Sequence, residues 1–201
     1  MKAPAAWMRI VAVAAASVLA IVVLVIHEQL AVAGGTEIAM AMQPVDPQAL
    51  LSGNYVAIQL SEPLAIGQAC PPGAVSGVMP STNLGTRPGR WVALAPRGGT
   101  WSAVGVATTR DAALKLAPLV AQGDVYCVPS VPDTPGSVAT DLGVSRVSLS
   151  QAEAQRVSNL AARPAASGGG VVLALMSIGT DGTARMKGLI VNGQRMEIRW
   201  Y

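Results

Sequence analysis

A single apolar run near the N-terminus constrains this chain more than any other feature. The segment from Ile10 to Ile26 has seventeen residues, and Ser17 is the only polar side chain in it. As an α-helix this segment would be about 26 Å long, which is close to the thickness of the hydrocarbon core of a bilayer. We therefore expect residues 1–33 to form a short stub and a single membrane-spanning helix, with residues 10–26 in contact with the lipid bilayer.

Charges on either side of this run predict its orientation. Lys2 and Arg9 precede the run, and Glu28 follows it. Positively charged flanks stay on the cytoplasmic side of a membrane. The N-terminus is therefore expected in the cytoplasm, and the remaining domain, residues 34–201, is expected outside.

A cleaved signal peptide is the alternative interpretation of the N-terminal segment. Residues 31–33 read Ala-Val-Ala before Gly34, a pattern of small residues that a signal peptidase accepts. Against cleavage, the run is longer than the usual apolar region of about 7 to 15 residues. The uncleaved anchor is favoured, and both interpretations place the domain outside the cytoplasm.

The composition limits what the exported part can be. The chain has no Phe, and 51% of its residues are hydrophobic, so the core must be built mainly from aliphatic side chains and Met. Beyond residue 34 there are 12 basic and 10 acidic residues, and Lys and Arg do not cluster beside aromatic residues. Nucleic acid is therefore not an expected partner. His27 is the only His, and because a metal site needs several converging ligands, no metal or cofactor is expected.

Alternation of apolar and polar residues predicts a mostly β domain of about nine strands. The expected strands are residues 36–43, 54–60, 90–94, 100–108, 123–128, 144–149, 171–178, 183–191 and 194–200. Trp91 and Trp101 are expected to face each other across the third and fourth of these strands. The Asp-Gly pair at 181–182 and the Asn-Gly pair at 192–193 are hairpin signals, because both central positions of a type I′ turn need positive φ.

Two short helices are expected. Asp111 is a suitable cap for residues 112–121, although Pro118 argues for a shorter or kinked helix. Residues 150–162 are expected to form a second helix, because Ser150 at the N-cap and Glu153 form a capping box.

Two segments rich in Pro and Gly, residues 61–90 and 129–143, are expected to be loops. The predicted fold of residues 34–201 is therefore a small antiparallel β sandwich or open barrel with one or two short helices, placed after one transmembrane helix.

A rigid corner lies between the first two strands. Residues 44–47 read Pro-Val-Asp-Pro, and residues 53–60 read Gly-Asn-Tyr-Val-Ala-Ile-Gln-Leu. The first proline removes a ladder donor, and the second keeps the preceding Asp out of the helical region. The candidate residues of this structural motif are Pro44, Asp46, Pro47, Gly53, Asn54 and Tyr55.

The order of these pieces resembles the GDYXXLXY family of uncharacterised, membrane-anchored bacterial proteins. That family has an N-terminal span, a strand, a Pro-x-Asp-Pro corner and a Gly-Asp-Tyr strand. Weaker similarity follows at residues 91–94, 142–154 and 171–193. With the expected orientation, the resemblance implies the bacterial inner membrane, a periplasmic domain, and a multi-spanning membrane protein as the partner to look for.

This chain departs from the family pattern at three charged positions. Gln48, Ser52 and Asn54 stand where the family usually has Arg, Arg and Asp. Asn54 can make the side-chain-to-backbone hydrogen bonds of a turn, but it cannot act as an acid or a base. We therefore expect Asp46 to form a turn and the motif to be structural, and no catalytic residue is assigned to it.

The only two cysteines are Cys70 and Cys127, and both lie in the exported part. An even pair in an oxidising compartment favours a disulfide. The alternative is two buried thiols.

Three classes of function remain. The first is a non-enzymatic interaction or accessory module for a membrane partner. The second is a small-ligand or lipid-binding domain, which would need an apolar pocket of several hundred Å³. The third and weakest is a serine–lysine hydrolase that resembles a signal peptidase around Ser76, although Val78 stands where that loop needs Ser, and Lys115 and Lys187 have no motif around them.

Four basic residues lie on the expected C-terminal strands: Arg185, Lys187, Arg195 and Arg199. They are expected on a solvated face, with a stripe that faces anionic lipid as the alternative.

Overall fold

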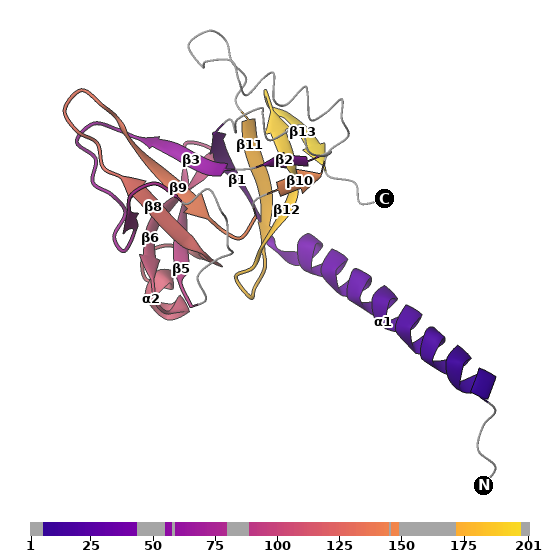
Figure 1. The fold of residues 1–201 in the computed structure, drawn as a ribbon. Coiled ribbons are helices and arrows are strands. Elements are labelled where there is room, and N and C mark those ends of the chain that lie inside the picture. The colour runs from indigo at the N-terminus through magenta and orange to yellow at the C-terminus, as the bar shows by residue number, and fades with distance from the viewer. Residues whose placement is uncertain are drawn as a thin grey trace.

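The computed structural model describes residues 6–43, 55–57, 59–79, 89–144, 146–148 and 172–197. Its N-terminal helix α1, Ala6–Gly34, extends away from the strands as a single rod (Figure 1). The strands and the second helix follow: β1 Thr36–Gln43, β2 Tyr55–Ala57, β3 Gln59–Leu64, β4 Val75–Ser76, β5 Trp91–Arg97, β6 Thr100–Ala107, α2 Arg110–Leu114, β7 Leu119–Gln122, β8 Asp124–Val128, β9 Gly136–Asp141, β10 Arg146–Ser148, β11 Val172–Ile178, β12 Ala184–Val191 and β13 Gln194–Glu197. The expected mostly β fold after one apolar helix is confirmed.

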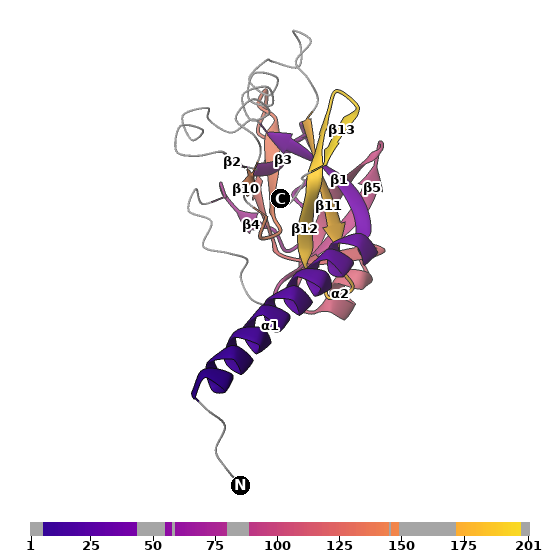
Figure 2. The ribbon, with the colours of Figure 1, turned by 90° about the vertical axis from the view of Figure 1, so that its right-hand side faces the viewer.

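Strand β1 joins two arms of the sheet. Its first six residues pair with β11, and β12 and β13 continue that arm outward. Its last two residues pair with β3, which leads through β9 and β8 to β4. A parallel bridge between Met40 and Trp101 adds β6, followed by β5 and β7. The sheet is open, and Figure 2 shows its strands at one end of α1.

The core is aliphatic, as the lack of Phe requires. Its largest fully buried side chains come from β1 and from all three branches that join it: Ile38, Leu60, Leu94, Met176, Ile178 and Leu189. Burial of aliphatic surface is the main favourable term in folding such a domain.

The C-terminal hairpins follow the prediction closely. Asn192 and Gly193 have positive φ, and they connect β12 to β13. In the other turn Gly182 has a φ of +80°, whereas Asp181 is not among the residues with positive φ. Asp181 instead accepts hydrogen bonds from the backbone N–H and the hydroxyl of Thr183.

Both predicted loops were too long. Residues 61–64 continue β3, and residues 75–76 form β4. Pro63 is tolerated because β1 pairs only with the first two residues of β3, which leaves Pro63 with one strand neighbour, β9. The second predicted loop contains β9, which pairs with both β3 and β8. The described residues form thirteen strands rather than about nine, and two of the pairings, β1–β6 and β4–β8, are parallel.

The predicted helix at residues 112–121 was wrong beyond Leu114. Helix α2 ends at Leu114, and Thr109 rather than Asp111 is its N-cap. Strand β7 begins directly after Pro118 and pairs with β5. The cap differs because the Thr109 side chain accepts a hydrogen bond from the Ala112 N–H.

The two tryptophans do not face each other. Trp91 lies opposite Ala107, and Trp101 lies opposite Pro96. Residues that face each other in a hairpin lie at similar distances from its turn. Trp91 lies much farther from the Gly98–Gly99 turn than Trp101 does. The predicted helix at residues 150–162 lies outside the described residues.

Candidate functional site

The junction between α1 and β1 has almost no linker. Residues 10–34 form the one described helix that is long and apolar enough to cross a membrane, a criterion that a signal sequence also meets. The helix ends at Gly34, and only Gly35 separates it from β1. A Cβ atom on Gly35 would overlap Ser177 Oγ and the backbone O of Ile178. The end of β11 therefore packs directly against the junction and limits its movement.

An ion pair ties the helix to the sheet just beyond the apolar run. Arg185 Nε on β12 lies 2.7 Å from Glu28 Oε1 on α1. Arg185 Nη2 also lies 3.6 Å from Asp181 Oδ2. The hydrogen bond from the Thr183 backbone, aided by the Arg185 charge, lowers the pKa of Asp181. One arginine thus connects α1 to the β11–β12 turn.

A second charged cluster joins β1 to β12 and β13. Glu37 Oε1 accepts a bond of 2.7 Å from Arg195 Nη1, and Glu37 Oε2 accepts one of 2.7 Å from Lys187 Nζ. These hydrogen bonds, first that of Arg195 and then that of Lys187, lower the pKa of Glu37. Lys187 is the extra residue of a β-bulge in β12.

Three of the four C-terminal basic residues are therefore held in ion pairs instead of standing as free solvated charges. Their partners are Glu28, Glu37 and Asp181. Because each positive charge lies beside a carboxylate, this surface offers little net attraction for anionic lipid. Arg199 lies outside the described residues.

Neutralising Glu37 is expected to make the domain less stable in a pH-dependent way. A carboxylate whose pKa is lowered in the folded state stabilises the fold above its ordinary pKa of 4.5. That contribution is lost as the pH falls through the lowered value. Because Glu37 is partly exposed, we expect Glu37→Gln to cost at most about 1 kcal/mol at neutral pH. Urea unfolding of the full chain in detergent micelles, from pH 7 down to pH 2.5, measures this. The cost should vanish at the acidic end.

The matched control is Asp133→Asn, an exposed carboxylate on the β8–β9 connection. It should unfold like the wild type across the whole pH range. A cost of Glu37→Gln that is independent of pH would contradict the ion-pair explanation.

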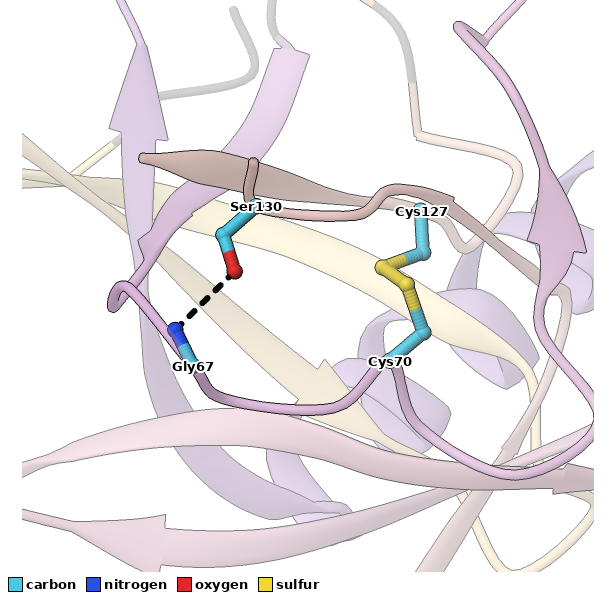
Figure 3. The surroundings of a disulfide bond; sticks show 4 residues. All are labelled: Gly67, Cys70, Cys127 and Ser130. Atoms are coloured by element: carbon cyan, nitrogen blue, oxygen red, sulfur yellow. Dashed lines mark hydrogen bonds between the residues drawn. A yellow bond between two sulfur atoms is a disulfide. The ribbon is translucent and has the colours of Figure 1, made fainter. Parts of the chain in front are cut away.

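The β3–β4 loop, residues 65–74, is braced from several directions. Cys70 and Cys127 form a disulfide with an S–S distance of 2.00 Å. Figure 3 shows this bond beside a second connection, in which the Gly67 N–H donates to Ser130 Oγ over 3.1 Å. The Val106 N–H donates to the Pro72 backbone O over 2.8 Å. The loop is thus fixed to β8, to the residues after it, and to β6.

A buried ion pair adds another brace. Asp124 is 1% exposed, and its Oδ1 lies 3.2 Å from Arg90 Nε. The same carboxylate oxygen accepts a hydrogen bond of 3.0 Å from the Val125 N–H. Arg90 also donates through Nη2 to the Gly73 backbone O. This pair connects the residue before β5 to β8 and to the β3–β4 loop.

The braced loop forms one wall of a surface groove. The groove has a volume of about 490 Å³ and is lined by residues 68–72, 95–97 and 102–104. Its volume falls in the range of about 300–1,000 Å³ that is usual for ligand sites. The groove lies between the loop and the β5–β6 hairpin.

The predicted structural motif is only partly described. Tyr55 begins β2, which pairs with β10, and Tyr55 lies opposite Ser148. Pro44, Asp46, Pro47, Gly53 and Asn54 lie outside the described residues.

The residues of the weakest alternative, a serine–lysine hydrolase, fall in different places. Ser76 lies in β4, opposite Cys127 of β8. Lys187 is bonded to Glu37 on β1, and Lys115 is the C-cap of α2. No described hydrogen bond joins Ser76 to either lysine.

No motif in the sequence predicts ion pairs at Glu28, Glu37, Arg90 or Asp124. The partners of Glu28 and Glu37 lie about 150 positions away in the chain, so only the strand register brings them together. Asp124 does carry a weak signal, because a carboxylate inside an apolar strand must find a partner when it is buried.

The comparison with family models identifies the family. The model of the GDYXXLXY protein family matches residues 17–189. The chain belongs to the GDYXXLXY family. The match covers most of the chain, beginning inside α1 and ending inside β12. Comparisons with curated proteins and with solved structures gave no match.

Proposed function

We propose that this GDYXXLXY protein is a single-pass protein of the bacterial inner membrane that serves as a non-catalytic interaction module for a multi-spanning membrane partner. Its N-terminus lies in the cytoplasm and its β domain in the periplasm. The Cys70–Cys127 disulfide supports the periplasmic placement, because disulfides persist in oxidising compartments.

The observation that carries this proposal is the junction between helix and sheet. A flexible tether would let the domain sample many orientations, whereas here only Gly35 separates α1 from β1 and Arg185 binds Glu28. A domain held in this way presents the same surfaces at a fixed height above the bilayer. Such an arrangement lowers the orientational cost of binding a neighbour in the same membrane.

Chemical crosslinking in intact membranes tests the interaction. The full chain should enrich a multi-spanning membrane protein when it is purified after crosslinking. A variant with ten Gly and Ser residues inserted between Gly34 and Gly35 keeps both the anchor and the domain, and it should enrich that protein several-fold less. Failure to enrich any membrane protein, or equal enrichment by both forms, would count against the proposal.

Two further measurements test the placement. Membranes washed in alkaline carbonate should retain the protein, and its release would favour a cleaved signal peptide. An alkaline phosphatase fused to Tyr201 should be active, because that enzyme needs the oxidising periplasm to form its disulfides. An inactive fusion would contradict the orientation.

The groove favours a second candidate function, the binding of a small apolar ligand or a lipid. Its volume of about 490 Å³ is sufficient, and seven of its eleven lining residues are alanine, valine or proline. Saturable binding of a small apolar anion such as 2-naphthoate to the full chain would support this candidate.

A further inference from the structure

The ion pair between Glu28 and Arg185 sets the height of the β domain relative to the apolar run of α1. Glu28 lies two residues beyond Ile26, the last residue of that run. Two residues of α-helix add about 3 Å along the axis. Because Arg185 Nε lies 2.7 Å from Glu28 Oε1, this end of β12 lies close to the level at which the hydrocarbon layer would end. Lipid headgroups occupy about the next 5–7 Å on each side of a bilayer.

A continuous series of contacts leads from this ion pair to α2. Arg185 also pairs with Asp181 in the β11–β12 turn. The next residue of that turn, Gly182, packs so closely against Trp91 that a Cβ atom on it would overlap the indole ring. The guanidinium carbon of Arg110, the first residue of α2, lies 5.9 Å from the centre of the same ring. Figures 1 and 2 show α2 and this turn on the side of the domain from which α1 leaves.

The end of α2 exposes two large apolar side chains on this side. Leu114 is 44% exposed and Leu116 is 48% exposed, whereas Ala113 is completely buried against the sheet. Lys115, between the two leucines, is also exposed. Tryptophan, leucine and basic side chains together are typical of surfaces that lie in the interfacial layer of a bilayer. We call the following residues the base surface: Trp91, Arg110, Leu114, Lys115, Leu116 and residues 179–183.

We propose that the base surface contacts the phospholipid headgroups of the membrane that α1 crosses. Leu114 and Leu116 enter the interfacial layer, and Arg110 and Lys115 bind lipid phosphates. The inference rests on the anchored arrangement of the proposed function and adds a second contact between the chain and the bilayer. Contact at two places restricts the tilt of the domain, which α1 alone would leave free.

Arg110 and Lys115 supply the attraction for phosphate. Within the described residues, no ion pair joins either of them to a carboxylate. Asp111 is the one acidic residue between positions 110 and 116, so two positive charges stand against one negative charge. Arg185 differs, because two carboxylates already pair with it. The apolar stems of Arg and Lys side chains can lie along the leucines while their charged ends reach the phosphates.

A nitrobenzoxadiazole dye on a Leu114→Cys variant tests the contact. The full chain is labelled without reductant, so that the Cys70–Cys127 bond stays closed, and is placed in nanodiscs of phosphatidylcholine and phosphatidylglycerol. Lipid with a nitroxide near the top of its acyl chain should quench this dye at least about twofold more strongly than the same dye on Val131→Cys. Val131 is the matched position, because it is 54% exposed and lies on the β8–β9 connection, at the far end of the domain from α1 (Figure 1).

A charge reversal tests the phosphate contact. Lys115→Glu, added to the Leu114→Cys variant, should reduce the quenching about twofold in these anionic nanodiscs. Arg97→Glu is the matched control, since it makes the same charge change at the other end of β5, about 20 Å along the strand from Trp91. It should leave the quenching at position 114 unchanged.

Each contrary result has a distinct meaning. Equal quenching at positions 114 and 131, in protein that stays in the nanodisc, would overturn the lipid contact while the interaction module survives. Equal effects of Lys115→Glu and Arg97→Glu would overturn the phosphate contact. Loss of the protein from the nanodiscs would overturn the anchor, and with it both the lipid contact and the proposed function.

Discussion

Replacing Cys70 and Cys127 together by alanine is expected to lower the free energy of unfolding by about 4 kcal/mol. The bond closes a loop with a sequence separation of 57 residues. In the chain-entropy model, loss of this cross-link raises the conformational entropy of the unfolded chain, which favours unfolding by that free energy. Urea unfolding of the full chain in detergent micelles, with and without reductant, measures the difference. In a domain of this size the melting temperature should fall by roughly 10 °C.

The wild-type protein under strong reductant is the matched comparison, since it loses the bond without any substitution. The double variant and the reduced wild type should unfold at similar urea concentrations, and reductant should not affect the variant further. Titration of the oxidised protein under denaturing conditions should find no free thiol. Two reactive thiols, or a stability that does not change with reductant, would show that the bond is not formed in the native protein.

Breaking the buried ion pair is expected to have the second largest effect. Asp124 is almost completely buried, so Asp124→Ala leaves the Arg90 guanidinium beside a cavity with its main negative partner removed. Loss of one member of a buried pair commonly costs 3–5 kcal/mol, and because Arg90 is partly exposed we expect about 3 kcal/mol. Chemical unfolding of the full chain provides the measurement.

A double-mutant cycle separates the charge from the lost packing. Arg90→Met combined with Asp124→Ala removes both charges, so the double variant should be more stable than Asp124→Ala alone. If the double variant is instead less stable by the sum of the two single effects, the two side chains do not interact. Arg110→Met is a matched control for the arginine, because Arg110 lies over the Trp91 ring in an exposed position.

What the sequence could predict here depended on distance along the chain. The apolar run and the Asn192–Gly193 turn carry their information within a few neighbouring residues, and both appear in the structure as expected. Strand β9 was missed because its residues Gly136 to Asp141 follow a stretch rich in proline and alternate only weakly. Its stability comes from β3 and β8, which flank it on both sides.

The candidate site was less predictable than the fold for the same reason. Arg97 and the β3–β4 loop are brought together only because Cys70 is bonded to Cys127 and Val106 holds Pro72. The cysteine pairing could be expected from the residues alone, but the groove beside it could not. Similarly, the charge of Arg185 was visible in the sequence, whereas its partner Glu28 lies 157 positions away.

Because α1 continues almost directly into β1, the direction in which the groove faces depends on the number of residues in the helix. Each residue of an α-helix adds about 100° of rotation about its axis. One residue gained or lost between Ile26 and Gly34 would therefore turn the whole β domain by about 100° around the helix axis, whereas seven residues would return it to nearly the same orientation. For a protein anchored as we propose, the number of residues in α1 therefore sets the direction in which the groove faces.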